Sequence, residues 1–558
     1  MKKLTKIFCL VLALAMMLSI ASCGGSSDNP GTNDASSGSN SSSNNNSNSN
    51  TEGAGTAAGG PRNLVYGINR DTSDASPYAT LSASRQQFMR LLYNYLFAAP
   101  YLGAPSDKLQ GEIGKSFSVD GNVITVEIYD YVKDSAGNAI TAEDVVFSYQ
   151  TSAASVNGTM LAGAMGDIRA IDDTHVEIEM AAGNIGDLEY ILTFVPIVSK
   201  SWYENASDAE ITTSPIGTGP YVLNEIVSGS HASFSKNENF WQTDESLRSV
   251  NSQQIYDNVT FKVILESAMN VIALENGEVD LARQIPATDL DTFRNDDYMI
   301  FPNLGSMFYC LMFNNGNSVF ANNKALRQAV LYGFDSESVR LAFGNDATSG
   351  SVLHTVGAPV YADYNDAWDN EDYYGYNLEK AKELMAEAGY PDGGLTLRLL
   401  YVKNTNSDAM VTVFQNYMAE LGITLDLLAY DQAMFDTLKY DSTAWDLEFD
   451  QKGGNPPYIT SVWQGLFDPA NYSDGDACFT HDDAFVDLLY TALSAETHSA
   501  EAIEAFHDYL TEQAYAYGVF FNYEFFVAQS GIEIVQDGNG NCTPTLFKLA
   551  DDYQSAAG

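Results

Sequence analysis

Basic side chains are scarce in this chain of 558 residues. Lysine and arginine together number 27, against 73 aspartates and glutamates, which leaves a formal net charge of −46 at pH 7. A surface with such an excess of negative charge repels nucleic acid and anionic lipid head groups. We therefore expect no nucleic-acid partner, although the bulk charge says little about a small ligand.

Histidine and the usual catalytic motifs are also sparse. The six histidines form no H-E-x-x-H motif and no other close pair on one helical face, so no ligand set of a zinc hydrolase is visible. The sequence contains no G-x-S-x-G motif, and Leu109 occupies the position where a phosphate-binding loop ending at 114–116 would need glycine. We expect no catalysis, no metal and no cofactor.

Long apolar runs are confined to the N-terminus. An apolar stretch at 7–20 follows three lysines and is too short to span a bilayer stably, and Ala21 and Ser22 lead directly into Cys23. This pattern resembles the lipobox of bacterial lipoproteins. The resemblance implies cleavage of the signal peptide 1–22, diacylglycerol on the Cys23 thiol, and export with a membrane tether. An ordinary signal peptide with an incidental cysteine is the alternative.

The segment 23–60 has nothing to bury after its first cysteine. It consists almost entirely of serine, asparagine, glycine, threonine and alanine. Such a composition cannot offset the entropy lost on ordering, so we expect a disordered linker. It would join the lipid-anchored Cys23, at the outer face of the cell membrane, to a folded body. Long linkers of this kind suit a Gram-positive cell.

Three further cysteines, Cys310, Cys478 and Cys542, lie in the body of the chain. Their wide spacing argues against a disulfide framework. A Cys478–Cys542 disulfide is the alternative in an exported protein. The expectation that we prefer is that all three are small buried side chains.

Strand and helix patterns alternate along the body. Apolar alternation predicts a hairpin around Asp120-Gly121 and a further strand at 176–180. Thr141 and Asp144 have the spacing of a capping box, which opens a helix. The predicted helices are 141–149, 323–330 and 378–388. Mixed strands and helices without a repeat indicate an α/β protein.

A set of short motifs follows in a fixed order along most of the body. They are LVYG at 64–67, SP at 76–77, LLYNYL at 91–96, AITAEDVVFSY at 139–149, PIGTGPY at 215–221, NFW at 239–241, LENGEVD at 274–280, KALRQAV at 324–330 and the stretch 378–394. In order and spacing they resemble family 5 of the extracellular solute-binding proteins, the oligopeptide, dipeptide and nickel group that serves ABC importers.

The resemblance implies a type II periplasmic-binding-protein-like fold. Two α/β lobes would be joined by a two-strand hinge and would close over the ligand, with a small subdomain inserted into the first lobe. The implied boundaries are 61–305 and 518–558 for lobe I, 77–190 for the inserted subdomain and 306–517 for lobe II.

The resemblance also implies where the ligand lies. Counted without gaps, the lining residues are Leu81, Ser82, Ala83, Ser306, Tyr309, Gln432, Phe449, Asp450, Lys452, Gly453, Gly454, Asn455 and Asn522. Gly453 and Gly454 would let the backbone approach a ligand closely. Peptide binders of the family have an aspartate where this chain has Asn455, and an amide cannot give the same charge-assisted bond to a peptide ammonium. Either Asp450 substitutes for it, or the ligand is not an ordinary peptide.

Other conspicuous residues have structural interpretations. Gly217 and Gly219 are interpreted as a turn that uses the positive φ open to glycine, not as a ligand loop. Arg327 is interpreted as an anchor between a helix and its neighbour. The aromatic stretch 361–376 is interpreted mainly as core packing.

The predicted function is that of a monomeric, lipid-anchored receptor. It would capture an oligopeptide or a related small solute outside the cell and pass it to the permease and ATPase subunits of an ABC importer. Three alternatives stay open: a ligand-sensing lipoprotein without transport, a binder of a sugar, opine or metal chelate, and a peptidase with an unrecognised site. Sparse histidines disfavour nickel.

Overall fold

The computed structural model describes residues 61–557, with short gaps. The gaps are 72–73, 79–82, 102–103, 156–157, 182, 304, 345–348, 372, 455–456, 537–541 and 552. The predicted signal peptide, Cys23 and the predicted linker therefore lie outside the described residues. In the part of the chain that is described, no helix combines the length and the apolar character that crossing a membrane requires.

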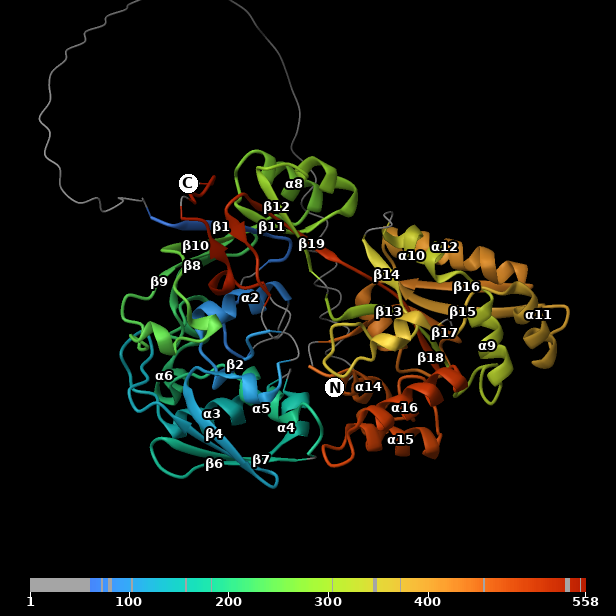
Figure 1. Cartoon of the computed structure of the whole chain (residues 1–558), viewed down its shortest axis with the longest axis horizontal. Helices are drawn as coiled ribbons and strands as arrows, with labels where there is room; N and C mark the ends of the chain where they lie inside the picture. Colours follow the sequence, from blue (N-terminus) through green and yellow to red (C-terminus); the bar gives the residue numbers. More distant parts are fainter. Residues whose placement is uncertain are drawn as a thin grey trace, which may run out of the picture. The chain divides into compact units, whose positions relative to one another are not determined.

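A seven-stranded sheet has the order β12-β19-β11-β1-β10-β9-β8 (Figure 1). Its strands are β1 (Asn63–Ile68), β8 (Tyr221–Val227), β9 (His231–Lys236), β10 (Asn258–Val263), β11 (Leu281–Ile285), β12 (Tyr298–Asn303) and β19 (Glu524–Gln529). β1 runs parallel to β10 and β11, whereas the other pairs are antiparallel. Leu64, Tyr66 and Ile68 of β1 are buried in a hydrophobic core.

A six-stranded sheet has the order β14-β18-β13-β17-β15-β16. Its strands are β13 (Met307–Phe313), β14 (Gly350–Val352), β15 (Leu395–Val402), β16 (Ile423–Tyr430), β17 (Leu447–Gly453) and β18 (Ala516–Asn522). Alternation along β13 serves two cores. Leu311 and Phe313 pack with α9, α11 and α12, whereas Phe308, Cys310 and Met312 pack with α14, α15 and α16. Helices therefore cover both faces of this sheet.

The helices of the second half of the chain are α9 (Lys324–Tyr332), α10 (Ser336–Gly344), α11 (Leu378–Glu387), α12 (Thr405–Glu420), α13 (Gln432–Leu438), α14 (Ile459–Phe467), α15 (Asp483–Leu493) and α16 (Ala500–Gln513). The predicted helices at 323–330 and 378–388 are confirmed as α9 and α11. Gly389, with φ of +97°, follows the end of α11. Arg327 of α9 is confirmed as an anchor, because its guanidinium donates to the carbonyl oxygens of Gln513 and Phe320 at 2.9 and 2.7 Å.

A four-stranded antiparallel sheet, β4-β5-β7-β6, lies within the first half of the chain. Its strands are β4 (Gly114–Asp120), β5 (Val123–Ile128), β6 (Met165–Ala170) and β7 (His175–Met180). The predicted hairpin is confirmed as β4 and β5, with Gly121 at φ +61° in the turn. The capping box is confirmed as well, because Thr141 and Asp144 bond reciprocally at the start of α3 (Ala142–Ala153).

The remaining elements are short. They are α2 (Ala83–Leu92), α4 (Thr159–Ala164), α5 (Asp187–Phe194), α6 (Lys200–Asn205), α7 (Asp208–Thr213), α8 (Ser267–Glu275), and the two-stranded pairs β2 (Phe97–Ala98) with β3 (Gln110–Gly111) and β20 (Ile532–Glu533) with β21 (Lys548–Leu549).

The chain passes between the two large sheets twice. It leaves β12 at Asn303 and enters β13 at Met307, and it leaves β18 at Asn522 and enters β19 at Glu524. Because β12 pairs with β19 and β13 pairs with β18, the two crossings are made by neighbouring strands. β18 belongs to the six-stranded sheet, so the chain returns to the seven-stranded sheet after Asn522. The predicted lobe boundaries stay predictions.

The glycines of the PIGTGPY motif have a different cause from the predicted one. Neither Gly217 nor Gly219 has a positive φ. Instead, a Cβ at Gly217 would lie 2.0 Å from the carbonyl oxygen of Leu92, and one at Gly219 would lie 2.4 Å from that of Leu91. The motif is a structural corner, as predicted, but close backbone approach requires its glycines.

Burial confirms two further interpretations. Cys310, Cys478 and Cys542 are all buried as reduced thiols. In the aromatic stretch, Trp368 and Tyr374 are buried in the cores of the second sheet, whereas Tyr376 is 43% exposed. The stretch therefore serves mainly for packing.

Candidate functional site

One end of the six-stranded sheet gathers several of the predicted ligand residues. β13 is antiparallel to both β17 and β18, so the start of β13 lies beside the ends of the other two strands. In register, Met307 faces Gly453, and Asn522 faces Gly350. The hydroxyl of Tyr361 donates to the carbonyl oxygens of Ser306 at 2.7 Å and Gly454 at 3.2 Å. This end of the sheet lies next to both crossings.

Gly453 is required by its backbone neighbour. Its φ is +120°, and a Cβ at this position would lie 2.2 Å from the carbonyl oxygen of Ser306. The close approach that is observed at Gly453 is therefore made to the start of β13. The implied approach of a ligand to Gly453 and Gly454 stays a prediction.

Three charged side chains alternate along β17: Glu448, Asp450 and Lys452, which we call the β17 strip. Lys452 forms an ion pair with Glu448, and these side chains are 12% and 2% exposed. Burial raises the pKa of Asp450 to about 6, while Lys452 lowers it and Glu448 raises it. Burial disfavours the charge on Lys452, but the carboxylates of Glu448 and Asp450 outweigh that effect and raise its pKa. Lys452 thus compensates the charge of Glu448, and Asp450 adds a second carboxylate beside this pair.

The other predicted residues occupy varied environments. Tyr309 stacks on Phe520 with ring centroids 4.6 Å apart, and burial, then the carboxylate of Asp450, raises the pKa of Tyr309. Phe449 is 1% exposed and packs against Phe414 in the core. Gln432 is exposed at the start of α13, where its amide donates to Asp436 at 3.2 Å. Their roles toward a ligand stay predictions.

Leu81, Ser82 and Asn455 lie outside the described residues, and Ala83 is the first residue of α2. The first predicted lining segment and the position that replaces the family aspartate therefore stay predictions.

The crossings also hold a polar group that was not predicted from the sequence as a whole, since only Asn522 of its residues was among the predicted ligand residues. Arg283 of β11 forms a two-pronged ion pair with Glu524 of β19, with Nη2 2.7 and 2.9 Å from the two carboxylate oxygens. Asn303 faces Glu524 in the β12–β19 ladder, and Asn522 precedes Glu524 by two residues. We call Arg283, Asn303, Asn522 and Glu524 the crossing cluster. The sequence signal for this group is one charged residue in each of two largely apolar strands. Arg283 lies within LARQI, and Glu524 is the first residue of EFFVAQ.

Several atoms of the crossing cluster are buried without a hydrogen-bond partner among the described residues. They are Nη1 of Arg283, Oδ1 of Asn303 and both amide atoms of Asn522. Buried polar atoms in proteins are nearly always hydrogen-bonded, and each unsatisfied one costs about 1–3 kcal/mol. The cluster can therefore offer donors and acceptors to a solute that carries both.

A second connection joins the segment after β7 to the helices of the second sheet. The backbone amide of Ile185 donates to the carbonyl oxygen of Leu493 at 2.8 Å. The backbone amide of Ala495 donates to the carbonyl oxygen of Gly183 at 3.0 Å. The hydroxyl of Ser461 in α14 donates to the carbonyl oxygen of Ile185 at 3.4 Å. The two halves of the folded body are thus in contact away from the crossings.

Comparison with protein families identifies the class. The model described as "Bacterial extracellular solute-binding proteins, family 5 Middle" matches residues 108–476. Because this match covers more than half of the chain, the chain belongs to this family, whose members are the solute-binding proteins of ABC importers. The family predicted from the motifs is confirmed.

Individual relatives agree with this assignment. The chain is 28% identical to the probable peptide ABC transporter periplasmic-binding protein y4tO of Sinorhizobium fredii. The alignment spans 370 residues and covers 64% of this chain and 68% of that protein. The solved structure of the oligopeptide-binding protein AppA of Bacillus subtilis with a nonapeptide matches with a TM-score of 0.69 at 18% identity, over 88% of this chain and 100% of that one.

A third relative was solved with a ligand of another kind. The structure of AgaA from A. tumefaciens R10 with agropinic acid matches with a TM-score of 0.68 at 20% identity, over 88% of this chain and 99% of that one. These likenesses confirm the predicted two-lobed α/β fold.

Proposed function

We propose that this chain is the substrate-binding component of an ABC importer, that it captures an oligopeptide or a related small solute outside the cell by closure of two lobes, and that it passes the solute to the permease. Family membership supports the transport role. On this proposal the chain catalyses no reaction, and the paired strands of the two crossings act as the hinge.

The crossing cluster is the observation that carries the proposal. It lies where the chain passes between the two sheets, and it keeps buried donors and acceptors without partners among the described residues. A peptide main chain supplies donors and acceptors in equal number, so it suits such a cluster. Because these groups already lie away from water, the low local dielectric would strengthen each hydrogen bond that they form with a solute.

Native mass spectrometry tests the proposal. The protein purified from its own cells is sprayed intact, and the small molecule that leaves it on activation is identified by fragmentation. A co-purifying peptide, followed by calorimetric binding of the synthetic peptide, is the expected result. A protein that carries no small molecule and binds none of a mixed peptide library would contradict the proposal.

A non-peptide solute is the second candidate. On the gapless count that the resemblance implies, Asn455 stands where peptide binders of the family have the aspartate that pairs with the peptide ammonium. AgaA, which has a similar fold, was solved with agropinic acid. A ligand without a free ammonium would not need that carboxylate. Identification of an opine or sugar in the same mass spectra would favour this candidate over a peptide.

We further propose that lipid on Cys23 holds the protein at the outer face of the membrane. The lipobox pattern supports this proposal. Cys23→Ser is expected to shift the protein from the membrane fraction to the medium. The two acyl chains on Cys23 would anchor the protein stably, and the variant has no thiol to carry them. Cys9→Ser in the same signal is the matched control and should leave the protein on the membrane.

A further inference from the structure

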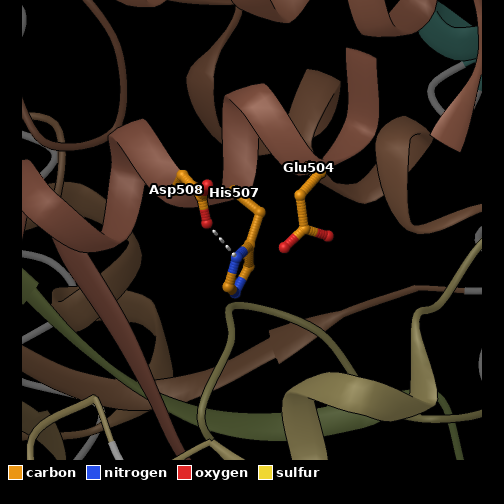
Figure 2. Close-up of side chains that lie close together, drawn as sticks. All are labelled: Glu504, His507 and Asp508. Carbon is orange, nitrogen blue, oxygen red and sulfur yellow. Dashed lines mark ion pairs between the residues drawn. The ribbon is translucent and has the colours of Figure 1, made fainter. Parts of the chain in front are cut away.

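Helix α16 carries three potential metal ligands on one face. Glu504, His507 and Asp508 follow the spacing i, i+3, i+4, which brings side chains together on a helix. One ligand atom of each residue lies within 4.8 Å of the corresponding atoms of the other two. Figure 2 shows the imidazole ring between the two carboxylates, with the 3.6 Å contact from Nδ1 of His507 to Asp508 marked. The group contains a single histidine, so a pattern of paired histidines does not indicate it.

His507 is buried in an unusual state. Its side chain is 0% exposed, and neither ring nitrogen has a hydrogen-bond partner among the described residues. The ring stacks on Trp368 with centroids 4.2 Å apart and meets the edge of Tyr373 at 5.3 Å. Because neither ring nitrogen is used in a hydrogen bond among the described residues, the imidazole can offer a lone pair to a metal ion.

The two carboxylates are held on either side of this ring. Glu504 accepts hydrogen bonds from the indole of Trp368 at 3.1 Å and from the amide of Asn365 at 3.0 Å, both on the same oxygen. Such outer contacts orient a metal ligand. Two carboxylates beside a neutral imidazole favour a dication.

A cavity borders the site at Asp508. It has a volume of about 480 Å³, and its lining includes Asp508, Tyr373, Lys380 and Glu512. Among the residues that line the cavity, Lys380 carries a positive charge. The carboxylate of Glu512 in the same lining is paired with Lys324 at 2.6 Å. An ion can therefore reach Asp508 from solvent without unfolding of α16.

We propose that Glu504, His507 and Asp508 bind a divalent transition-metal ion, with Zn²⁺ as the best match. Zn²⁺ accepts imidazole nitrogen and carboxylate oxygen in a tetrahedral shell, and water from the cavity would complete the three protein ligands. Ca²⁺ and Mg²⁺ prefer shells of oxygen alone, so the nitrogen disfavours them. This site lies on helix α16, apart from the crossing cluster, and its existence does not depend on the proposed transport function.

Titration calorimetry with Zn²⁺ alone tests the site. The full chain is stripped with chelator and then titrated, and one Zn²⁺ is expected to bind at this site. Glu504→Gln and Asp508→Asn preserve shape and should each weaken that binding by about tenfold or more. Glu501→Gln on the same helix and His481→Ala, an exposed histidine beside Asp474, are matched controls that should leave the affinity unchanged.

X-ray absorption of the loaded protein reads the ligands directly. A nitrogen ligand at about 2.0 Å is expected in the wild type, and its loss is expected in His507→Ala that circular dichroism shows to be folded. An oxygen-only shell, no uptake of Zn²⁺ beyond that of Glu504→Gln, or an equal loss in the controls would each overturn the site. None of these outcomes bears on solute capture, which is measured separately by mass spectrometry.

Discussion

The β17 strip and the crossing cluster are both groups of buried or half-buried polar side chains beside the crossings, and they differ in how their atoms are satisfied. Lys452 of the strip is paired with Glu448 on its own strand. In the crossing cluster, Arg283 is paired with Glu524, yet Asn522 and one nitrogen of Arg283 keep no partner among the described residues. The difference suggests that the strip serves stability and the cluster serves binding.

The largest expected effect concerns the strip. Lys452→Met leaves Glu448, which is 2% exposed, without its counter-charge, and such a change should lower the free energy of unfolding by about 3 kcal/mol. Urea unfolding followed by tryptophan fluorescence measures it. The double variant Lys452→Met/Glu448→Met should regain most of the loss, because it removes both charges. If Lys452→Met has the same free energy of unfolding as the wild type, the Lys452–Glu448 pair does not contribute to stability.

The pH dependence of stability isolates Asp450. Its pKa is about 6 in the folded protein against an ordinary value of 3.8, so the folded state holds this proton more tightly. The contribution of Asp450 to the free energy of unfolding is therefore largest below about pH 4 and is lost as the pH rises through about 6. Between pH 4 and pH 7 the loss amounts to about 2 kcal/mol. Asp450→Asn should lack this fall. The measurement compares the unfolding free energies of both proteins at pH 4 and pH 7, and parallel curves would contradict the raised pKa.

The residues that follow β17 in the sequence give the next test. Asn455 follows Gly454, and the gapless count predicts that it occupies the position of the aspartate in peptide binders. If the solute is a peptide with a free ammonium, Asn455→Asp should tighten its binding about tenfold, because a charge-assisted bond replaces a neutral one. Calorimetry with the free and the N-acetylated peptide distinguishes the cause, since only the free form should gain. An unchanged affinity for both would show that this position does not face the ligand.

The smallest expected effect concerns the cluster. Asn522→Leu removes the amide with little change in volume, so it should weaken the binding of the co-purifying solute by a few-fold to about tenfold. Stability should stay unchanged or rise slightly, because no partner among the described residues loses a bond. Asn205→Ala, at the exposed end of α6, is the control. Loss of stability with unchanged affinity would reverse the assignment of roles.

Much of the local structure was predictable because short-range patterns determine it. The capping box at Thr141 and Asp144 and the β4–β5 hairpin depend on residues a few positions apart. The Arg283–Glu524 pair, by contrast, joins residues 241 positions apart. Gly217 shows the same limit at a single residue, because the contact with Leu92 that requires glycine is made across 125 positions and its φ is not positive.

Composition and motifs that are local in the chain were sufficient to predict the family, the alternation of strands and helices, and the acidic character of the chain. The tertiary structure decided which polar atoms are matched and which are not. Ion pairing in the β17 strip, the unpartnered amide of Asn522 and the burial of His507 between Glu504 and Asp508 all depend on packing. Burial removes the water that would otherwise satisfy each group, so only the folded chain can show which groups are left to bind something else.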